Sequence, residues 1–505
     1  MKPLSVSAVA FVAIAASLAS VGTHTKSAPW QSAQFENVLG TSMEIKLVAA
    51  NSAARDRAET AAMNEIKRLN AILSGYDAAS EFSRWAHSEN RAVRVSPELM
   101  EVLKLWDNWR ERTGGALNPA AEAVSQVWKQ AQTAGHLPSA AAMASAAKAA
   151  GQPQWTLDEK SGTATRLTAT PLMLNSFTKS YIIDRAAAAV LQVPGVSAVV
   201  LNIGGDLAVR GNSSDLVGVA DPRADAENGR PIATLDIGNR AVATSGDYRR
   251  GFDIAGKHYS HIVDPLTGQT AEGVIGATVV ADKAVDAGAL ATAFCVLTPA
   301  ESRKLAASVP GVEYMLVAKS GARVVSAGWN AMLAQVAPVR KVSTSPAEGG
   351  QWNPGYELTV NFELPQAQGF GARRPYVAVW IEDKDHFPVR TLGVWFDKTR
   401  WLNELRAWYR DDRLRAMSEG NEILGSVTSA TRSPGKYSFK WDGNDNSGKP
   451  VKAGQYTVMI EAAREHGGYS LLHREMNFDG EPAKAQLPAD VEMGAVSLDY
   501  HKAVR

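Results

Sequence analysis

The feature that most constrains this sequence is a change of character between Ala337 and Asn353, where proline, serine, threonine and glycine replace alternating apolar and polar residues. A stretch of this composition is typical of a linker between domains. The chain has 505 residues, which is also too long for one ordinary hydrophobic core. We therefore expect domains at residues 35–337 and 353–480, a linker at 338–352 and a tail at 481–505.

Helical and strand patterns alternate before the linker. Ala53–Leu73 repeats apolar residues at helical spacing, and Ser96 followed by Pro97 is typical of the start of a second helix. Ser197–Val209 indicates a strand, a glycine turn and a second strand. This alternation predicts an α+β domain in which helices pack on mixed sheets.

After the linker the pattern is mostly that of short strands. Tyr376–Ile381 and Tyr456–Ile460 are rich in residues that favour strands, and Trp441–Gly443 supplies turn chemistry between strands. We predict that the second domain is an all-β sandwich of the immunoglobulin-like type.

The N-terminus has the layout of a cleavable secretory signal. Lys2 precedes an apolar run, Val6–Ala19, that is shorter than the roughly 20 residues a membrane-spanning helix needs. A membrane anchor is the alternative interpretation. No later segment approaches the length and apolarity of a transmembrane helix. We expect residues 1–25 to be removed on export, which leaves a periplasmic mature chain without a transmembrane helix.

Charge and cysteine content exclude further classes of protein. The formal net charge is +1, so no broad basic surface is available to neutralise the phosphates of a nucleic acid. The single cysteine, Cys295, lies in an apolar stretch and allows no intramolecular disulfide. We expect Cys295 to be a buried structural thiol, and no nucleic-acid partner.

Four stretches of the first domain carry the residues with chemical potential. In chain order they are Tyr76-Asp77 with Ser80–Arg84, Gly114–Pro119, Lys179–Arg185 with Asn202–Asp206, and Ala243–Tyr248 with Tyr259–Pro265 and Ala289–Thr292. Each is weak evidence alone, but the ordered set resembles the FAD:protein FMN transferases, the ApbE-like family. The resemblance covers roughly Phe35 to Ala337.

This resemblance implies an enzyme that moves FMN from FAD to a threonine or serine hydroxyl of an acceptor protein and releases AMP. In the family a Mg²⁺ ion bridges the FAD pyrophosphate, where positioning and charge neutralisation dominate the chemistry. The acceptor would be an exported or membrane-associated flavoprotein. The residues that would bind FAD are Tyr76, Ala116, Leu117, Asn118, Lys179, His261 and Ile262. The residues that would hold the metal are Ser176, Asp286, Ala291 and Thr292.

Two of these residues have a chemical role of their own. His261 would accept the proton of the attacking hydroxyl, a task that suits histidine near neutral pH, although a structural histidine beside a turn is the alternative. Lys179 would meet a phosphate, and its alternative is a solvated surface lysine. Asp264 is expected to cap the turn with Pro265.

Acidic positions of the family pattern are neutral in this chain. The carboxylate expected four residues before Thr292 is replaced by Gly288, and the other two acidic positions are Asn118 and Met173. Asp286 could substitute only if the helix begins at Ala287 or later, because it lies about 120° from Thr292 on an ideal helix. The alternative hypothesis is therefore a flavin-binding or scaffolding protein of an envelope redox system that has lost transferase activity.

The second domain resembles an uncharacterised family of predicted periplasmic domains, and it is also similar to immunoglobulin-like modules of the flagellar hook-cap type. The resemblance rests on Arg374–Asp383, Val389–Leu392, Trp441–Gly443 and Glu461–Gly468. We expect this domain to serve binding or docking and not catalysis.

Overall fold

The structure is a computed structural model. It describes residues 30–224, 226–246, 251–334, 350–366, 374–396, 399–419, 428–429, 431–432, 434–464 and 467–503. The predicted signal at 1–25 and residues 338–349 of the predicted linker lie outside these ranges.

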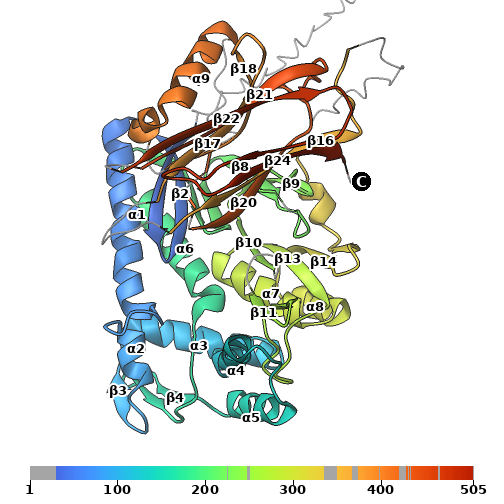
Figure 1. Ribbon diagram of the computed structural model, residues 1–505. Coiled ribbons are helices and arrows are strands. Elements are labelled where there is room, and N and C mark those ends of the chain that lie inside the picture. Colours follow the sequence, from blue (N-terminus) through green and yellow to red (C-terminus); the bar gives the residue numbers. More distant parts are fainter. Residues whose placement is uncertain are drawn as a thin grey trace, which may run out of the picture.

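The first domain is built on one eight-stranded sheet (Figure 1). Its strands are, in spatial order, β1 (Gln31–Val38), β2 (Thr41–Ala49), β6 (Val196–Ile203), β7 (Asp206–Gly211), β10 (Ala241–Gly246), β13 (Val274–Ala281), β14 (Glu313–Ala318) and β15 (Arg323–Val325). Neighbouring strands pair antiparallel throughout. The predicted strand, glycine turn and strand at Ser197–Val209 is confirmed as β6 and β7.

Helices cover one face of this sheet. They are α1 (Ser52–Leu73), α6 (Asn175–Leu191), α7 (Ala284–Val296) and α8 (Pro299–Ala307). Helix α1 begins where Asn51 Oδ1 accepts from Ala54 N at 2.9 Å, and its apolar stripe runs from Ala58 to Leu73 at helical spacing. That stripe packs with α6, α7 and the sheet in the main core, so the α+β prediction is confirmed.

The other face of the sheet has a smaller cover. The hairpin β8 (Ser214–Val219) and β9 (Ala233–Gly238) packs on it with the short helix η1 (Trp329–Met332). Buried apolar side chains of β6, β7, β10, β13 and β14 form a separate core with this hairpin and Trp329. The sheet is therefore buried on both faces over its central strands.

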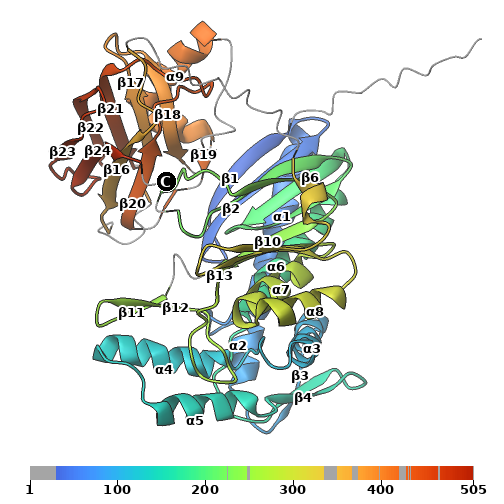
Figure 2. The same ribbon diagram turned by 90° about the vertical axis from the view of Figure 1, so that its right-hand side faces the viewer.

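A helical region closes one end of the first domain. It comprises α2 (Glu81–Ala86), α3 (Pro97–Arg112), α4 (Ala121–Ala134) and α5 (Ala140–Gly151), with a small sheet of β3 (Ala92–Arg94), β5 (Thr163–Arg166) and β4 (Trp155–Asp158). A further hairpin, β11 (Gly251–Ile254) and β12 (Lys257–Ser260), packs on α4 (Figure 2), where Trp128 stacks on Phe252 and contacts the tilted ring of Tyr259.

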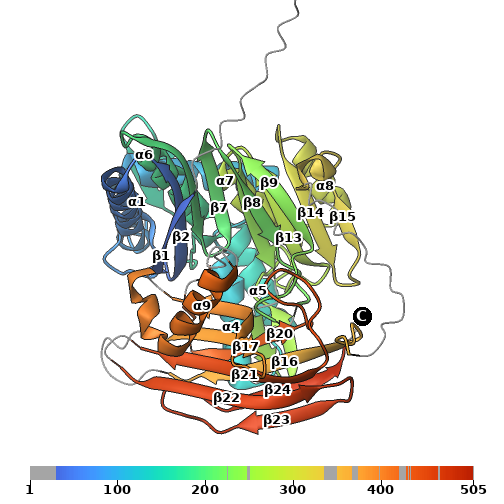
Figure 3. The same cartoon turned by 90° about the horizontal axis from the view of Figure 1, so that it is seen from above.

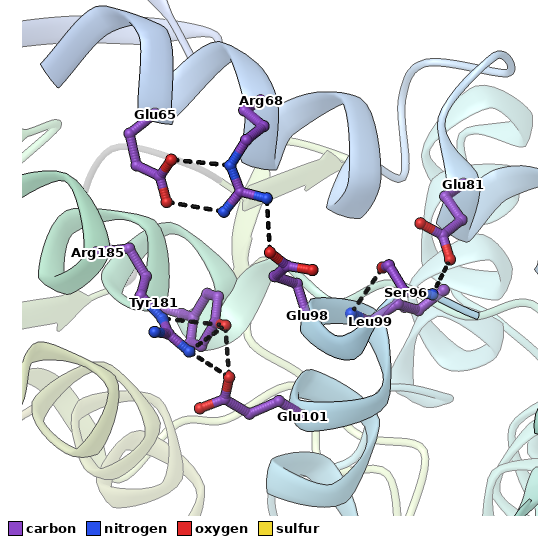
Figure 4. A network of polar contacts seen from close by, with 9 residues as sticks. All are labelled: Glu65, Arg68, Glu81, Ser96, Glu98, Leu99, Glu101, Tyr181 and Arg185. Carbon is purple, nitrogen blue, oxygen red and sulfur yellow. Dashed lines mark hydrogen bonds and ion pairs between the residues drawn. The ribbon is translucent and has the colours of Figure 1, made fainter. Parts of the chain in front are cut away.

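Polar contacts tie α1, α3 and α6 together (Figure 4). Arg68 of α1 binds Glu65 at 2.8 Å and reaches Glu98 in the first turn of α3 at 2.6 Å. Tyr181 of α6 donates to Glu101 of α3 at 2.8 Å. Because these bonds hold the start of α3 against two other helices, the helical region has a fixed position beside the sheet.

The start of α3 follows the sequence prediction. Ser96 Oγ accepts from Leu99 N at 3.2 Å, and Pro97 occupies the first helical position. Glu81 accepts from Ser96 N at 2.6 Å, which links this cap to α2 (Figure 4).

The second domain is a sandwich of two sheets. One has the strand order β20 (Gly435–Trp441), β16 (Tyr356–Leu364), β24 (Val496–Lys502) and β23 (Ala483–Leu487). The other has the order β19 (Thr428–Ser429), β18 (Pro388–Trp395), β17 (Tyr376–Glu382), β21 (Gly454–Ala463) and β22 (Tyr469–Phe478). Their facing sides enclose an aromatic core, which confirms the predicted sandwich.

The folded second domain extends past both of its expected bounds. The expected tail at 481–505 contains β23 and β24, and β24 pairs with β16 and β23 inside the sheet. Trp352, placed in the linker, is buried against Trp441 and Phe478 of the core. The sequence prediction missed these strands because short alternating runs near a chain end resemble a polar tail.

The second domain also contains a helix that the all-β prediction did not include. Helix η2 (Thr399–Glu404) leads into α9 (Arg406–Glu419), which packs on the outer side of the five-stranded sheet (Figure 1). The buried carboxylate of Glu461 accepts from Ala407 N at 3.0 Å and from Trp408 N at 2.9 Å. Burial raises the pKa of Glu461, while the two N–H donors partly oppose that shift.

The two domains lie side by side and meet along β20 (Figures 2 and 3). Glu227 N donates to Ser438 O at 2.7 Å, and the side chain of Asn228 bonds both the N–H and the carbonyl of Lys440, at 2.8 and 2.7 Å. Arg432 pairs with Glu227 at 3.1 Å. The first domain thus satisfies the backbone groups at the edge of the second domain's sheet.

In the ranges that the structure describes, no helix has the length and apolarity required to cross a bilayer.

Candidate functional site

A cleft of about 2540 Å³ opens where the two domains meet. The first domain contributes the start of α6, the loop after α3, the ends of β10 and α7, and the turn after β12. The second domain contributes the segments before β17 and β20 and part of β24. The cleft therefore gathers residues from the four stretches that the sequence singled out, and adds a wall from the second domain.

The loop after α3 forms one side of the cleft. Gly114 and Gly115 have φ of +60° and +94°, a backbone region that glycine adopts at little cost. Ala116, Leu117 and Asn118 follow, are buried, and line the cleft. Asn118 is committed to the fold, since its Oδ1 accepts from Ala120 N at 2.9 Å and its Nδ2 donates to Ala150 O at 3.0 Å.

Lys179 lies on α6 and points to the turn between β6 and β7. Its ammonium is 3.1 Å from Asp206 Oδ2 and 3.4 Å from Gly204 O. The side chain keeps 28% of its exposure and lines the cleft, whereas that of Asp206 keeps 10%. Lys179 is therefore held in place by the fold with its charge at the cleft surface.

Gly288 lies on the face of α7 that packs against α6. A Cβ placed on Gly288 would collide with Ser180 Oγ and stand 3.1 Å from Ser180 Cβ. Ser180 is fully buried and donates to Asp206 Oδ2 at 3.1 Å. Ser180 thus occupies the space that a carboxylate side chain at position 288 would enter.

The condition under which Asp286 could stand in for that carboxylate is not met in the structure. It required a helix that begins at Ala287 or later, but α7 begins at Ala284. Asp286 therefore projects from a different face of the helix than Thr292 and is absent from the cleft lining. Burial raises the pKa of Asp286, with Lys283 opposing the shift and Asp184 adding to it.

Thr292 and its neighbour Ala291 have different surroundings in the structure. Thr292 lines the cleft, where its Oγ1 lies 3.2 Å from Ser245 Oγ of β10. Ala291 is fully buried in the core and does not line the cleft. Cys295, one turn further along α7, is buried as predicted.

His261 lies in the turn after β12, exposed on the cleft side. Ile262 next to it is buried, and both residues line the cleft. Asp264 accepts from Leu266 N at 2.9 Å and from Thr267 Oγ1 at 2.7 Å. These bonds confirm that Asp264 is a turn cap, and the cap holds the segment that carries His261. Asp247 and Tyr248, which belong to the same motif, lie outside the described residues.

Tyr76 and Ser176 complete the predicted set. Tyr76 is 82% exposed, and its hydroxyl accepts from Asn175 Nδ2 at 2.8 Å. Ser176 is half-buried in the first turn of α6, and both line the cleft. The exposed ring of Tyr76 offers a flat apolar surface at one end of the cleft, of the kind on which an aromatic ring system stacks.

The cleft also contains polar residues that the sequence did not indicate as site residues. Glu44 is on β2, on the opposite side of the strand from Met43 and Ile45, and burial raises its pKa while Lys46 opposes that shift. Arg374 and Lys436 come from the second domain. The alternation of β2 indicated that Glu44 leaves the core, but the two cations could be placed only by the docking of the domains.

The described residues do not fit the Mg²⁺ ion that the family resemblance implies. Among them, no group of three or more His, Cys, Asp or Glu side chains is arranged to hold a metal ion. Ser180 fills the space at Gly288, Asp286 faces elsewhere, and Asp206 is already paired with an ammonium group. Hard cations require several convergent oxygen ligands, which the described side chains do not supply.

The first domain has the fold of the ApbE proteins. The ApbE protein of Thermotoga maritima MSB8 superposes with a TM-score of 0.54 and 27% identity, over 60% of this chain and 99% of that one. The flavinyl transferase ApbE of Pseudomonas stutzeri has the same fold, with a TM-score of 0.51 at 20% identity over 61% of this chain and 98% of that one.

The chain belongs to the ApbE family, whose model matches residues 39–316. A FAD:protein FMN transferase of Klebsiella pneumoniae (strain 342) is 25% identical over 293 residues, which cover 55% of this chain and 82% of that protein. One from Rhodobacter capsulatus is 31% identical over 240 residues, 46% of this chain and 44% of that protein. Residues 357–495 match a second family, described as "Predicted periplasmic protein (DUF2271)".

Proposed function

We propose that this protein is a FAD:protein FMN transferase that attaches FMN to a threonine or serine hydroxyl of an exported flavoprotein. One observation supports this most directly. The cleft joins Tyr76, Asn118, Lys179, His261 and Thr292, which lie far apart in the sequence, at one surface. The resemblance implies that Tyr76, Asn118, Lys179 and His261 bind FAD, and it assigns Thr292 to the metal position.

The proposed reaction is a phosphoryl-type transfer. The hydroxyl oxygen of the acceptor attacks the phosphorus on the FMN side of the FAD pyrophosphate, and the bond from that phosphorus to the oxygen of AMP breaks. FMN is left joined to the acceptor by a phosphoester bond, and AMP departs. His261 takes the hydroxyl proton and passes it to the departing phosphate or to water. Lys179 supplies positive charge near the pyrophosphate.

The Mg²⁺ ion that the sequence analysis expected is not part of this proposal. Only two of the four expected metal ligands, Ser176 and Thr292, line the cleft. The other two, Asp286 and Ala291, do not. Charge at the pyrophosphate is therefore assigned to side chains of the protein.

We assign the second domain the task of receiving the acceptor. Its Arg374, Lys436 and Tyr437 line the cleft opposite the first domain, so an acceptor segment that reaches the flavin passes along them. We further propose that residues 1–25 direct export to the periplasm, in line with the description of the family that the second domain matches.

A second candidate function is flavin binding without transfer, in an envelope redox system. The replacement of acidic positions by Gly288, Asn118 and Met173 favours it. In that case FAD would enter the cleft and remain intact.

An experiment with FAD and an acceptor separates the two candidates. The full-length protein is incubated with FAD and a threonine-containing segment of an exported flavoprotein, and intact masses are recorded. An added FMN on the acceptor is the expected result. FAD that binds but leaves every acceptor unmodified would replace the transferase proposal by the second candidate.

A further inference from the structure

We propose that this protein binds the FAD pyrophosphate without a divalent cation, with the ammonium group of Lys179 as the local positive charge. This inference rests on the FAD-binding part of the proposed function and holds for both candidate functions. Two observations support it. Ser180 occupies the space beside Gly288, and Lys179 is held at the cleft surface.

The space for a metal-binding carboxylate on α7 is closed by the neighbouring helix. A Cβ at Gly288 would collide with the hydroxyl of Ser180 and stand 3.5 Å from Phe177 Cα. Ser180 is fully buried and bonded to Asp206, so moving its hydroxyl away would break that hydrogen bond. The helix pair is packed around a serine at 180 and a glycine at 288, and a carboxylate side chain at position 288 would have to displace the hydroxyl of Ser180.

Lys179 is next to that closed space and faces the cleft. Its ammonium group bonds Asp206 Oδ2 at 3.1 Å and Gly204 O at 3.4 Å, which fixes its position before any ligand arrives. An ammonium group has three donors, so one can remain for a phosphate oxygen. Because Lys179 and Asp206 together are neutral, Lys179 would hold a pyrophosphate oxygen through a charge-assisted hydrogen bond and not through a surplus of local charge.

Asp206 holds Lys179 and is not available for a metal ion. A cation bound to its carboxylate would be a second positive charge beside the ammonium group, which lies 3.1 Å from Asp206 Oδ2, and the two positive charges would repel each other. Arg374 and Lys436 across the cleft are further cations of the same lining. The lining also contains carboxylates, among them Glu44 and Glu363, so the cleft offers cations at particular positions and not a net positive surface.

The test measures FAD binding by the full-length protein through flavin fluorescence, once with excess Mg²⁺ and once with EDTA. The two dissociation constants are expected to agree within about twofold. Lys179→Gln should weaken binding by about tenfold or more in both buffers, as loss of a charge-assisted hydrogen bond predicts. Lys104→Gln, on the exposed side of α3 where Lys104 pairs with Glu159, is the matched control and should change nothing.

A double variant, Ser180→Gly with Gly288→Asp, removes the side chain at position 180 and introduces a carboxylate at position 288. It is expected to bind FAD about tenfold more tightly with Mg²⁺ than with EDTA, whereas Ser180→Gly alone should not respond to Mg²⁺. Thermal melting of each variant identifies any that fails to fold. If the double variant fails to fold, Lys179→Gln still tests the inference.

Tightening of FAD binding by Mg²⁺ of about tenfold or more in the unaltered protein would overturn the inference. A double variant that folds and ignores Mg²⁺ would also overturn its steric basis. If the unaltered protein binds no FAD in either buffer, the proposed function fails as a whole.

Discussion

Ser180 and Gly288 share one space between α6 and α7, and only one of them has a side chain in it. The hydroxyl of Ser180 lies where a Cβ at Gly288 would stand, and it bonds Asp206 at 3.1 Å. The absence of a carboxylate at position 288 is therefore coupled to the presence of a side chain at position 180. The missing carboxylate is not a lone loss from an otherwise unchanged site, because the neighbouring helix has closed the place where it would lie.

The role of His261 is tested by His261→Ala. We expect the rate of FMN transfer to fall by about 10²- to 10⁴-fold, the usual contribution of a general base, because the attacking hydroxyl loses its proton acceptor. FAD affinity should stay within about twofold. Transfer is followed by mass spectrometry and FAD binding by fluorescence.

His136→Ala is the control for this variant. His136 is exposed between α4 and α5 and bonds only its neighbour Leu137 among the contacts described. Its removal should leave transfer unchanged. Equal rates for His261→Ala and the unaltered protein would exclude His261 as the base.

Docking of the two domains is tested by Asn228→Ala. The change removes two hydrogen bonds to Lys440 and leaves its backbone groups at the sheet edge without these partners, a cost of about 1–3 kcal/mol. We expect a larger radius of gyration in small-angle X-ray scattering and faster proteolysis between the domains. Asn477→Ala, on β22 in the other sheet, should have neither effect. Unchanged scattering for both variants would show that the Asn228 contacts do not hold the domains together.

Asp286 provides a test that depends on pH. Its pKa is raised in the folded state chiefly by burial, so folding favours the protonated form, and this contribution to stability is lost as pH rises above the ordinary value of 3.8. Asp286→Asn should therefore raise Tm at pH 8, by less than about 3 °C for a domain of this size, and give no gain at pH 4. FAD binding should be unaffected. A loss of FAD affinity in this variant would contradict this prediction and show that Asp286 takes part in FAD binding.

Glu461 is expected to stabilise α9. Glu461→Ala leaves the N–H groups of Ala407 and Trp408 without their acceptor, at a cost of about 1–3 kcal/mol to the second domain. Calorimetry should show a lower melting temperature for the transition of that domain. Glu475→Ala, exposed on β22, is the control. An unaltered melting curve in Glu461→Ala would mean that water replaces the carboxylate at the helix start.

Local rules were sufficient for much of the fold. Helix α3 begins at Ser96 and Pro97 as expected, because the capping signal is contained in four consecutive residues. The turn at Gly204 and the strands on either side followed from alternation and from glycine. Helix α9 was missed because Glu461, which caps it, is more than 40 residues away along the chain.

Prediction of the site had a different limit. The ordered motifs identified Lys179, His261 and Thr292, all of which line the cleft. The sequence could not reveal that Ser180 blocks Gly288, since this depends on how α6 and α7 pack. It also could not place Arg374 in the same cleft, because that requires the contact between the two domains.

The most direct test of the central claim counts products in a reaction with FAD and an acceptor segment. AMP is quantified by chromatography, and protein-bound FMN by its fluorescence after denaturation. The account predicts one AMP for each FMN that becomes attached to the acceptor. AMP and free FMN without flavin on the acceptor would indicate pyrophosphate hydrolysis, and either that result or intact FAD throughout would contradict a transferase.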